Sequence, residues 1–119
     1  MRLLHNRNIW WAAALCVSAF CASAPAIAAA DDAVAQGEAI LQKNCSRCHA
    51  IGTTGKSTHP QAPPFRDVVT RYPVEDLEES LAEGIVSGHP DMPEFTFTPD
   101  EINAIVAYLN DLKAKTAGK

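Results

Sequence analysis

The stretch Cys45-Ser46-Arg47-Cys48-His49 constrains this chain more than any other part of its sequence. It places two thiols and an imidazole within five consecutive residues. Three kinds of site use such a set of side chains: a redox-active dithiol, a zinc site and a haem attachment site. Each alternative requires different surroundings, so the rest of the sequence discriminates among them.

Two of the alternatives leave parts of the motif unexplained. A redox-active dithiol usually lies at a helix start in a βαβ setting, but no segment of the chain alternates convincingly as a strand. The histidine of the motif would also have no required role. A structural zinc site needs four ligands, normally paired at two separated places. His59 or His89 could be the fourth ligand, yet neither belongs to a second pair.

A haem attachment site accounts for every position. Cys45 and Cys48 lie three residues apart, so on a helical turn their sulfurs share one face and can bond to two vinyl groups of a porphyrin. His49 follows at once and can place a ring nitrogen on the iron. The pattern Cys-x-x-Cys-His is typical of c-type haem attachment. We therefore predict one covalently bound haem c, with thioether bonds to Cys45 and Cys48 and an axial bond from His49 to the iron.

The N-terminal region has the layout of a secretory signal peptide. A weakly basic start precedes an apolar run over residues 9–20, which is too short for a membrane span. Small residues then lead to Ala26-Ile27-Ala28, an A-x-A cleavage pattern, with cleavage after Ala30 as the alternative. We expect residues 1–28 to be removed and residues 29–119 to form one monohaem domain in the periplasm. Cys45 and Cys48 are the cysteines that remain.

The charge of the remaining chain limits its partners. Loss of Arg2 and Arg7 with the leader leaves eight basic residues against fourteen acidic ones, a net charge of −6. This balance argues against nucleic acid or an anionic membrane surface, and it predicts partners with basic docking patches. A chain of this length buries only roughly 60–65% of its unfolded surface and usually needs additional stabilisation, which a covalently bound haem would supply.

Helical periodicity predicts an all-α fold of three main helices joined by long irregular loops. Asp31 or Asp32 can cap a first helix that runs into the motif, and a second helix follows Pro73. The third helix has a capping box, with Thr98 as the N-cap and Glu101 three residues later. The apolar positions are Val34, Ile40 and Leu41, then Val74, Leu77, Leu81 and Ile85, then Ile102, Ile105, Val106, Leu109 and Leu112. Residues 52–65 and 85–96 are rich in Gly and Pro and are expected to be loops around the haem.

An iron bound by His49 has a second axial position, for which the chain offers three candidates. Met92 lies in a polar loop flanked by prolines, directly before the third helix, which is a poor place for a methionine that fills a core gap. His59 and His89 are the alternatives, although a lone loop histidine is more often solvated. We predict that Met92 is the sixth ligand.

From about Gly37 to Leu112 the chain resembles the class I cytochromes c, especially their short bacterial monohaem members. Besides the motif, the resemblance rests on Gly37, on Ala62-Pro63-Pro64-Phe65, on Asp91-Met92-Pro93 and on Ile105-Val106-Ala107-Tyr108-Leu109. It implies the small cytochrome c fold, wrapped around one haem.

The resemblance also implies two specific contacts. Gly37 would let the last helix approach the first one closely, at Ile105 and Tyr108. The carbonyl of Pro63 would accept a hydrogen bond from the ring of His49, which fixes the imidazole. The loops further offer Arg66, Arg71 and Tyr72 as candidates for binding the haem propionates.

These expectations define a function class. If His49 and Met92 both bind the iron, no coordination position is open, so we expect an electron carrier rather than an enzyme. The expected protein is a soluble periplasmic monomer that does not insert into the membrane and exchanges single electrons with periplasmic or membrane-bound redox proteins. Two alternatives remain open: an electron-transfer subunit of a dehydrogenase or oxidase complex, and a haem sensor or enzyme with a displaceable Met92.

Overall fold

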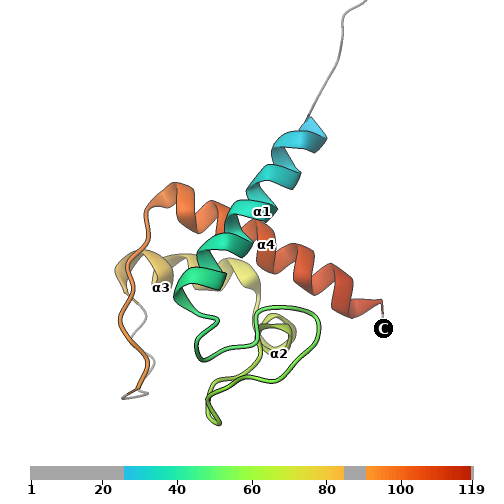
Figure 1. The fold of residues 1–119 in the computed structure, drawn as a ribbon. Coiled ribbons are helices and arrows are strands. Elements are labelled where there is room, and N and C mark those ends of the chain that lie inside the picture. The colour runs from blue at the N-terminus through green and yellow to red at the C-terminus, as the bar shows by residue number, and fades with distance from the viewer. Residues whose placement is uncertain (1–25, 85–90, 119) are drawn as a thin grey trace, which may run out of the picture.

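The computed structural model describes residues 26–84 and 91–118 (Figure 1). These residues form helices and loops without any strand, which confirms the all-α prediction. The elements in chain order are α1 (Ala26–Asn44), α2 (Phe65–Arg71), the 3₁₀ turn η1 (Val74–Asp76), α3 (Leu77–Glu83) and α4 (Pro99–Ala117). Most of the predicted signal peptide, Ile85 and His89 lie outside the described residues.

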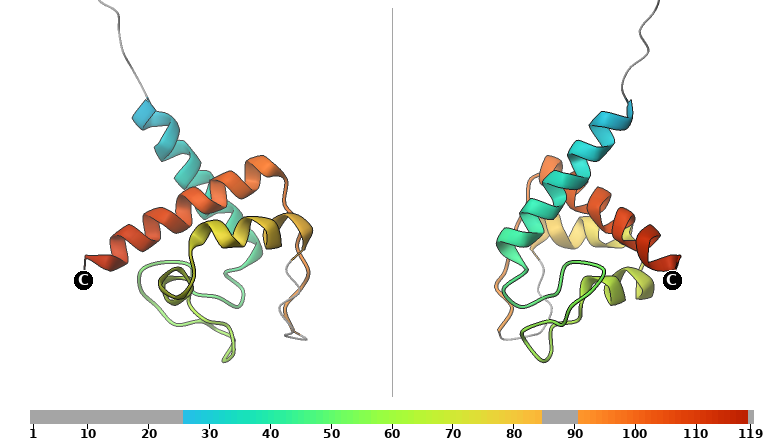
Figure 2. Two further views of the ribbon diagram at one scale, coloured as in Figure 1. Left: turned by 180° about the vertical axis from the view of Figure 1, so that it is seen from behind. Right: turned by 45° about the vertical axis from the view of Figure 1, so that its right-hand side comes forward.

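The first and last helices cross, and their contact is the most extensive between any two of the described helices (Figures 1 and 2). Gly37 is buried at this crossing. A Cβ atom at position 37 would overlap the carbonyl oxygen of Ala104 and would lie 2.8 Å from the Cβ of Tyr108. The close approach predicted at Gly37 is therefore confirmed. Its nearest atoms belong to Ala104 and Tyr108, while Ile105 is fully buried in the core.

The start of α4 follows the predicted capping box. The Thr98 hydroxyl accepts a hydrogen bond from the backbone N–H of Glu101, and the Glu101 carboxylate accepts one from the backbone N–H of Thr98 at 2.9 Å. Pro99 occupies the first helical position, where its missing N–H costs nothing. These bonds satisfy two backbone donors at the helix start and fix where α4 begins after the loop.

The predicted start of the first helix is wrong. Asp31 and Asp32 lie inside α1 as exposed residues, because the helix begins at Ala26. Alanine has the highest helix propensity, and the alanines between residues 26 and 30 extend the helix without any residue that would break it. The two aspartates therefore do not act as N-caps in this structure.

The middle of the chain also differs from the prediction. The expected helix after Pro73 is divided into the 3₁₀ turn η1 and the seven-residue helix α3. Gly84 ends α3 with a φ of 103°, a conformation that favours glycine. The short helix α2 follows Pro64 and was not predicted, because seven residues with adjacent valines give little periodic signal.

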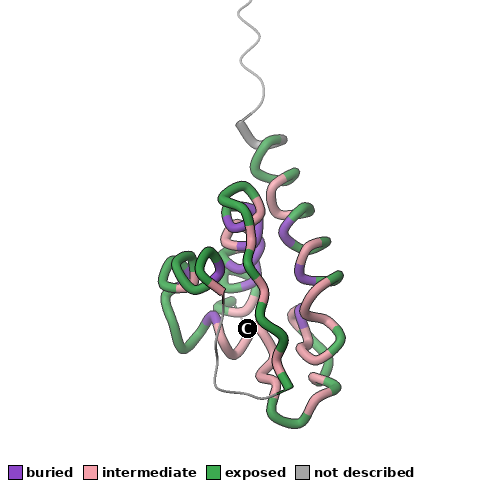
Figure 3. The backbone as a smooth tube through the Cα atoms, turned by 90° about the vertical axis from the view of Figure 1, so that its left-hand side faces the viewer, coloured by how far each residue is buried: buried purple, intermediate pink, exposed green. Residues whose placement is uncertain are grey.

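The core lies where the helices face each other. Figure 3 shows buried residues along the inner sides of α1 and α4, whereas the described loops are partly buried or exposed apart from Ile51. The core residues besides Gly37 are Leu41, Ile51, Val69, Val74, Leu81, Ile102, Ala104, Ile105, Tyr108, Leu109 and Leu112. Among the helices that the structure describes, none is both long and apolar enough to cross a membrane.

Candidate haem-binding site

The motif Cys45–His49 forms a tight turn directly after α1. The backbone N–H of Cys48 donates to the carbonyl of Cys45 at 3.1 Å, and that of His49 donates to the same carbonyl at 2.9 Å. Such bonds make a helical turn, which brings side chains three residues apart onto one face. Both thiols are free and half-buried. The backbone therefore has the local geometry that attachment to one edge of a porphyrin requires.

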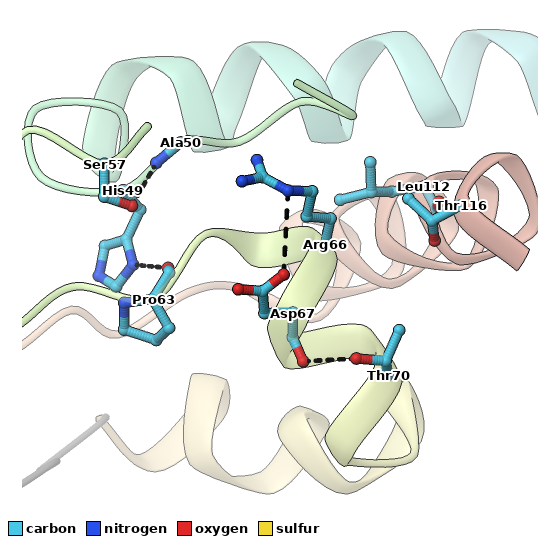
Figure 4. Close-up of polar contacts among 9 residues, drawn as sticks. All are labelled: His49, Ala50, Ser57, Pro63, Arg66, Asp67, Thr70, Leu112 and Thr116. Carbon is cyan, nitrogen blue, oxygen red and sulfur yellow. Dashed lines mark hydrogen bonds and ion pairs between the residues drawn. The ribbon is translucent and has the colours of Figure 1, made fainter. Parts of the chain in front are cut away.

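The imidazole of His49 has a fixed orientation. Its Nδ1 lies 2.7 Å from the carbonyl oxygen of Pro63 (Figure 4). Since a carbonyl oxygen only accepts, Nδ1 carries the proton and the lone pair lies on Nε2, available for a metal. The ring of Phe65 stacks on the imidazole with centroids 5.0 Å apart. The contact between Pro63 and His49 that the resemblance implied is thus confirmed.

The proline-rich loop reaches His49 because it is folded back on the motif. The backbone N–H of Ala50 donates to the hydroxyl of Ser57 at 3.1 Å, and the backbone N–H of Phe65 donates to the carbonyl of Ala50 at 2.9 Å. The hydroxyl of Thr58 donates to the carbonyl of Arg47. These bonds hold the loop in a closed form and place Pro63 beside the imidazole.

Some apolar side chains that pack against the core remain partly exposed. They are Val34, Ile40, Cys45, Phe65, Leu77, Phe97 and Val106. Cys45 belongs to the motif and Phe65 stacks on His49. A large flat apolar group bound at the motif would remove apolar surface of this kind from water, which favours binding. The residues present therefore fit a haem held by Cys45, Cys48 and His49.

The structure does not support the zinc and dithiol alternatives. Within residues 26–84 and 91–118, no three His, Cys, Asp or Glu side chains converge to hold a metal ion. The same residues contain no strand, so the motif does not lie in a βαβ setting. Burial, with a smaller contribution from Cys48, raises the pKa of the Cys45 thiol to about 11. Near neutral pH this thiol is protonated, unlike the reactive thiolate of a redox dithiol.

Residues 32–109 match the family model of the cytochrome c oxidase, cbb3-type, subunit III. The chain belongs to this family of c-type cytochrome domains. The matched range includes the motif, Pro63 and Met92, which supports the resemblance to class I cytochromes c and indicates haem c as the cofactor.

One curated protein is similar to this chain in sequence. The cytochrome c oxidase subunit 2 of Alkalihalophilus pseudofirmus is 34% identical over 91 residues, which cover 66% of this chain and 25% of the relative. The chain thus spans about a quarter of that protein's length. No solved structure gives a significant match.

Met92 lies in the loop that precedes α4 and is partly buried. The neighbouring Asp91 places its Oδ2 3.5 Å from Nε2 of His59, so the loop that carries Met92 meets the loop that follows the motif. Ligation of the iron by Met92 stays a prediction. Of the alternative ligands, His59 pairs with Asp91, and His89 lies outside the described residues.

The three propionate candidates lie in different surroundings. The Nη1 atom of Arg66 is buried without a hydrogen-bond partner, and its Nε lies 3.8 Å from Asp67. In Figure 4 the Nε2 of His49, the nitrogen left free for a metal, points away from the Arg66 guanidinium. Arg71 and Tyr72 are exposed. Propionate binding by any of the three stays a prediction.

Two contacts around the site were not predicted from the sequence. The stacking of Phe65 on His49 is one of them. The other is the hydroxyl of Tyr108, which donates to the carbonyl of Ile51 at 2.9 Å and ties α4 to the chain just after the motif. A tyrosine on the apolar face of a helix needs a hydrogen-bond partner when buried, but the sequence does not identify that partner.

Proposed function

We propose that this c-type cytochrome is a soluble periplasmic carrier of single electrons with one covalently bound haem c. In this proposal Cys45 and Cys48 hold the haem through thioether bonds, and His49 and Met92 are the axial ligands of the iron. The observation that carries the proposal is the hydrogen bond between His49 Nδ1 and Pro63, which leaves Nε2 free and oriented to bind a metal, on a residue that directly follows two free cysteines.

The residues around the site suit electron transfer in which no covalent bond is made or broken. A bound haem iron would supply reversible one-electron exchange, and ligation by an imidazole and a thioether would favour its reduced form. Pro63 and Phe65 hold the imidazole in one orientation, so that ligand need not move when the charge changes. Partly buried apolar side chains at the site, such as Cys45 and Phe65, would help to exclude water from the haem, which also raises the potential. Met92 would close the remaining iron position to oxygen and peroxide.

Visible spectra of the purified haem protein test the ligand set. We expect the oxidised protein to show the weak far-red charge-transfer band of iron bound to a methionine sulfur. Met92→Ala should lose this band, lower the reduction potential and let the reduced protein bind carbon monoxide. Met92→His is the matched control, because it fills the same position with nitrogen: the band is lost, but carbon monoxide stays excluded. A wild-type protein that binds carbon monoxide rapidly would instead indicate a sensor or enzyme.

The periplasmic location rests on the predicted signal peptide. Mass spectrometry of the protein purified from the periplasmic fraction should show an N-terminus at Ala29, or at Asp31 with the alternative cleavage site. Retention of residues 1–28 on a protein found in the membrane fraction would contradict both the processing and the soluble location.

A second candidate function is that of an electron-transfer subunit in an oxidase complex. The matching family model and the curated relative are both described as oxidase subunits, which supports this alternative. Purification from both the periplasmic and the membrane fraction of native cells distinguishes the two functions. A carrier is recovered alone as a monomer, whereas a subunit is recovered with its partners in fixed proportion.

The charge of the chain suggests the chemistry of the partner. The acidic side chains of η1 and α3 are exposed: Glu75, Asp76, Glu78, Glu79 and Glu83. A redox partner with a basic docking patch would associate faster through this surface charge, and added salt would slow the reaction. Electron-transfer rates that do not change with ionic strength would instead favour an apolar docking contact.

A further inference from the structure

The loop that carries Met92 contacts the loop that follows the haem motif. The Nε2 atom of His59 and the Oδ2 atom of Asp91 lie 3.5 Å apart. Asp91 directly precedes Met92, whereas His59 belongs to the loop that places Pro63 on His49. Both loops lie at the same end of the molecule, below the crossing of α1 and α4 in the views of Figures 1 and 2. This side-chain contact joins the segments that would hold the two axial ligands.

His59 is fixed on its own loop. Its backbone N–H donates to the carbonyl of Cys48 at 3.3 Å, and its carbonyl accepts from the backbone N–H of Ala62 at 3.1 Å. Its Nδ1 accepts a hydrogen bond from the backbone N–H of Gln61 at 3.3 Å. Because Nδ1 accepts, the neutral ring carries its proton on Nε2, the nitrogen that faces Asp91. The imidazole is therefore oriented to donate to the carboxylate.

The other end of the Met92 loop is fixed separately. The backbone N–H of Phe97 donates to the carbonyl of Leu81 at 3.0 Å, and the next residue, Thr98, caps α4. Phe95 stacks on Phe97 with ring centroids 6.0 Å apart. These contacts hold residues 95–98 against the helices. Asp91, at the start of the described loop, is held by its contact with His59.

We propose that His59 is a positioning residue that acts through Asp91 to keep Met92 in place for binding the iron. This inference rests on the proposed function, since it takes Met92 as the sixth ligand. The side chains of His59 and Asp91 are 33% and 71% exposed. Exposed pairs are weak, so losing this contact should raise the population of the form without bound Met92 only about two- to five-fold.

The affinity of the oxidised haem protein for added imidazole measures that population, because imidazole binds the iron only when Met92 has left. His59→Asn removes Nε2 and keeps an acceptor for the backbone N–H of Gln61, so it breaks the contact without disturbing the local turn. Asp91→Asn removes the charge from the other side. We expect each variant to bind imidazole about two- to five-fold more tightly than the wild type and to have a lower reduction potential.

The double variant decides whether the two residues act together. If they do, His59→Asn with Asp91→Asn has the affinity of either single variant rather than the product of both effects. Asp111→Asn is the matched control, because it breaks a comparable partly exposed pair with Lys115 on α4 and should leave imidazole binding unchanged.

The possible failures are distinguishable. The positioning role alone is overturned if the wild type shows the methionine band but the variants bind imidazole as the wild type does. It is likewise overturned if the effects of the two single variants on imidazole affinity add up in the double variant. A wild type without the methionine band overturns both this role and the proposed ligation by Met92.

Discussion

The contact between α1 and α4 predicts a large effect of one added methyl group. In Gly37→Ala the new Cβ would meet the Ala104 carbonyl, with the carbonyl carbon at 2.6 Å and the Cβ of Tyr108 at 2.8 Å. These atoms belong to backbone and to the root of a side chain, so they cannot rotate away and the helices must separate. Overpacking of this kind costs about 3 kcal/mol, helix propensity returns about 1 kcal/mol, and a net loss of about 2 kcal/mol remains.

Denaturant unfolding of the oxidised haem protein, followed by circular dichroism, tests this value. A loss of that size lowers the melting temperature by about 10 °C in a domain of this length. Two variants separate the contributions. Ala39→Gly, at an exposed position of α1, measures the propensity term alone and should cost about 1 kcal/mol. Gly52→Ala adds a methyl group where no atom lies within 4 Å and should change little. If Gly37→Ala were as stable as the wild type or more so, the helices would not be in contact at Gly37.

Two further variants test the hydrogen bonds of α4. Tyr108→Phe should lose about 1 kcal/mol of unfolding free energy, because the hydroxyl donates to the carbonyl of Ile51. Burial, then the charges of Glu38 and Asp111, raise the pKa of Tyr108. The stability that the protonated Tyr108 hydroxyl contributes is present below the unfolded pKa of about 10 and is lost as the pH rises through the folded pKa. Tyr108→Phe has no hydroxyl to ionise, so it should lose less stability than the wild type as the pH rises above about 10. An equal alkaline loss in both proteins would contradict this assignment. Hydrogen bonds from the Thr98 backbone and side chain lower the pKa of Glu101. The stability that the Glu101 carboxylate contributes is present above its unfolded pKa and is lost as the pH falls through its folded pKa. Glu101→Gln should therefore flatten the acid side of the stability profile, measured by thermal unfolding between pH 3 and 7. An unchanged acid side would show that this carboxylate adds no stability.

Local signals in the sequence predicted some elements well and others poorly. The start of α4 was predictable because Thr98, Pro99 and Glu101 fix it through contacts within one turn. The start of α1 was not, since Asp31 is a good cap in isolation but follows alanines that continue the helix. Helix α2 was not predicted because it is short and because its position depends on the folded loop before it rather than on its own periodicity.

The same distinction applies to the site. The turn of the motif follows from the spacing of Cys45 and Cys48, and the bond between His49 and Pro63 followed from the resemblance. The contact between His59 and Asp91 could not be predicted, because it joins two irregular loops whose paths no periodic pattern specifies.

The burial pattern separates a core that protein atoms close from apolar surface that they leave partly exposed. The crossing of α1 and α4 buries Leu41, Ile105 and Leu112 almost completely with protein atoms alone. By contrast, Phe65, Leu77 and Phe97 remain partly exposed although they pack on that core. Each partly exposed apolar side chain leaves hydrophobic stabilisation unrealised, at roughly 25 cal/mol per Å². Because Phe65 stacks on His49, a haem bound by His49 would cover apolar surface beside it and stabilise the loop that carries Pro63. Binding of the haem and orientation of His49 would thus depend on the same contacts.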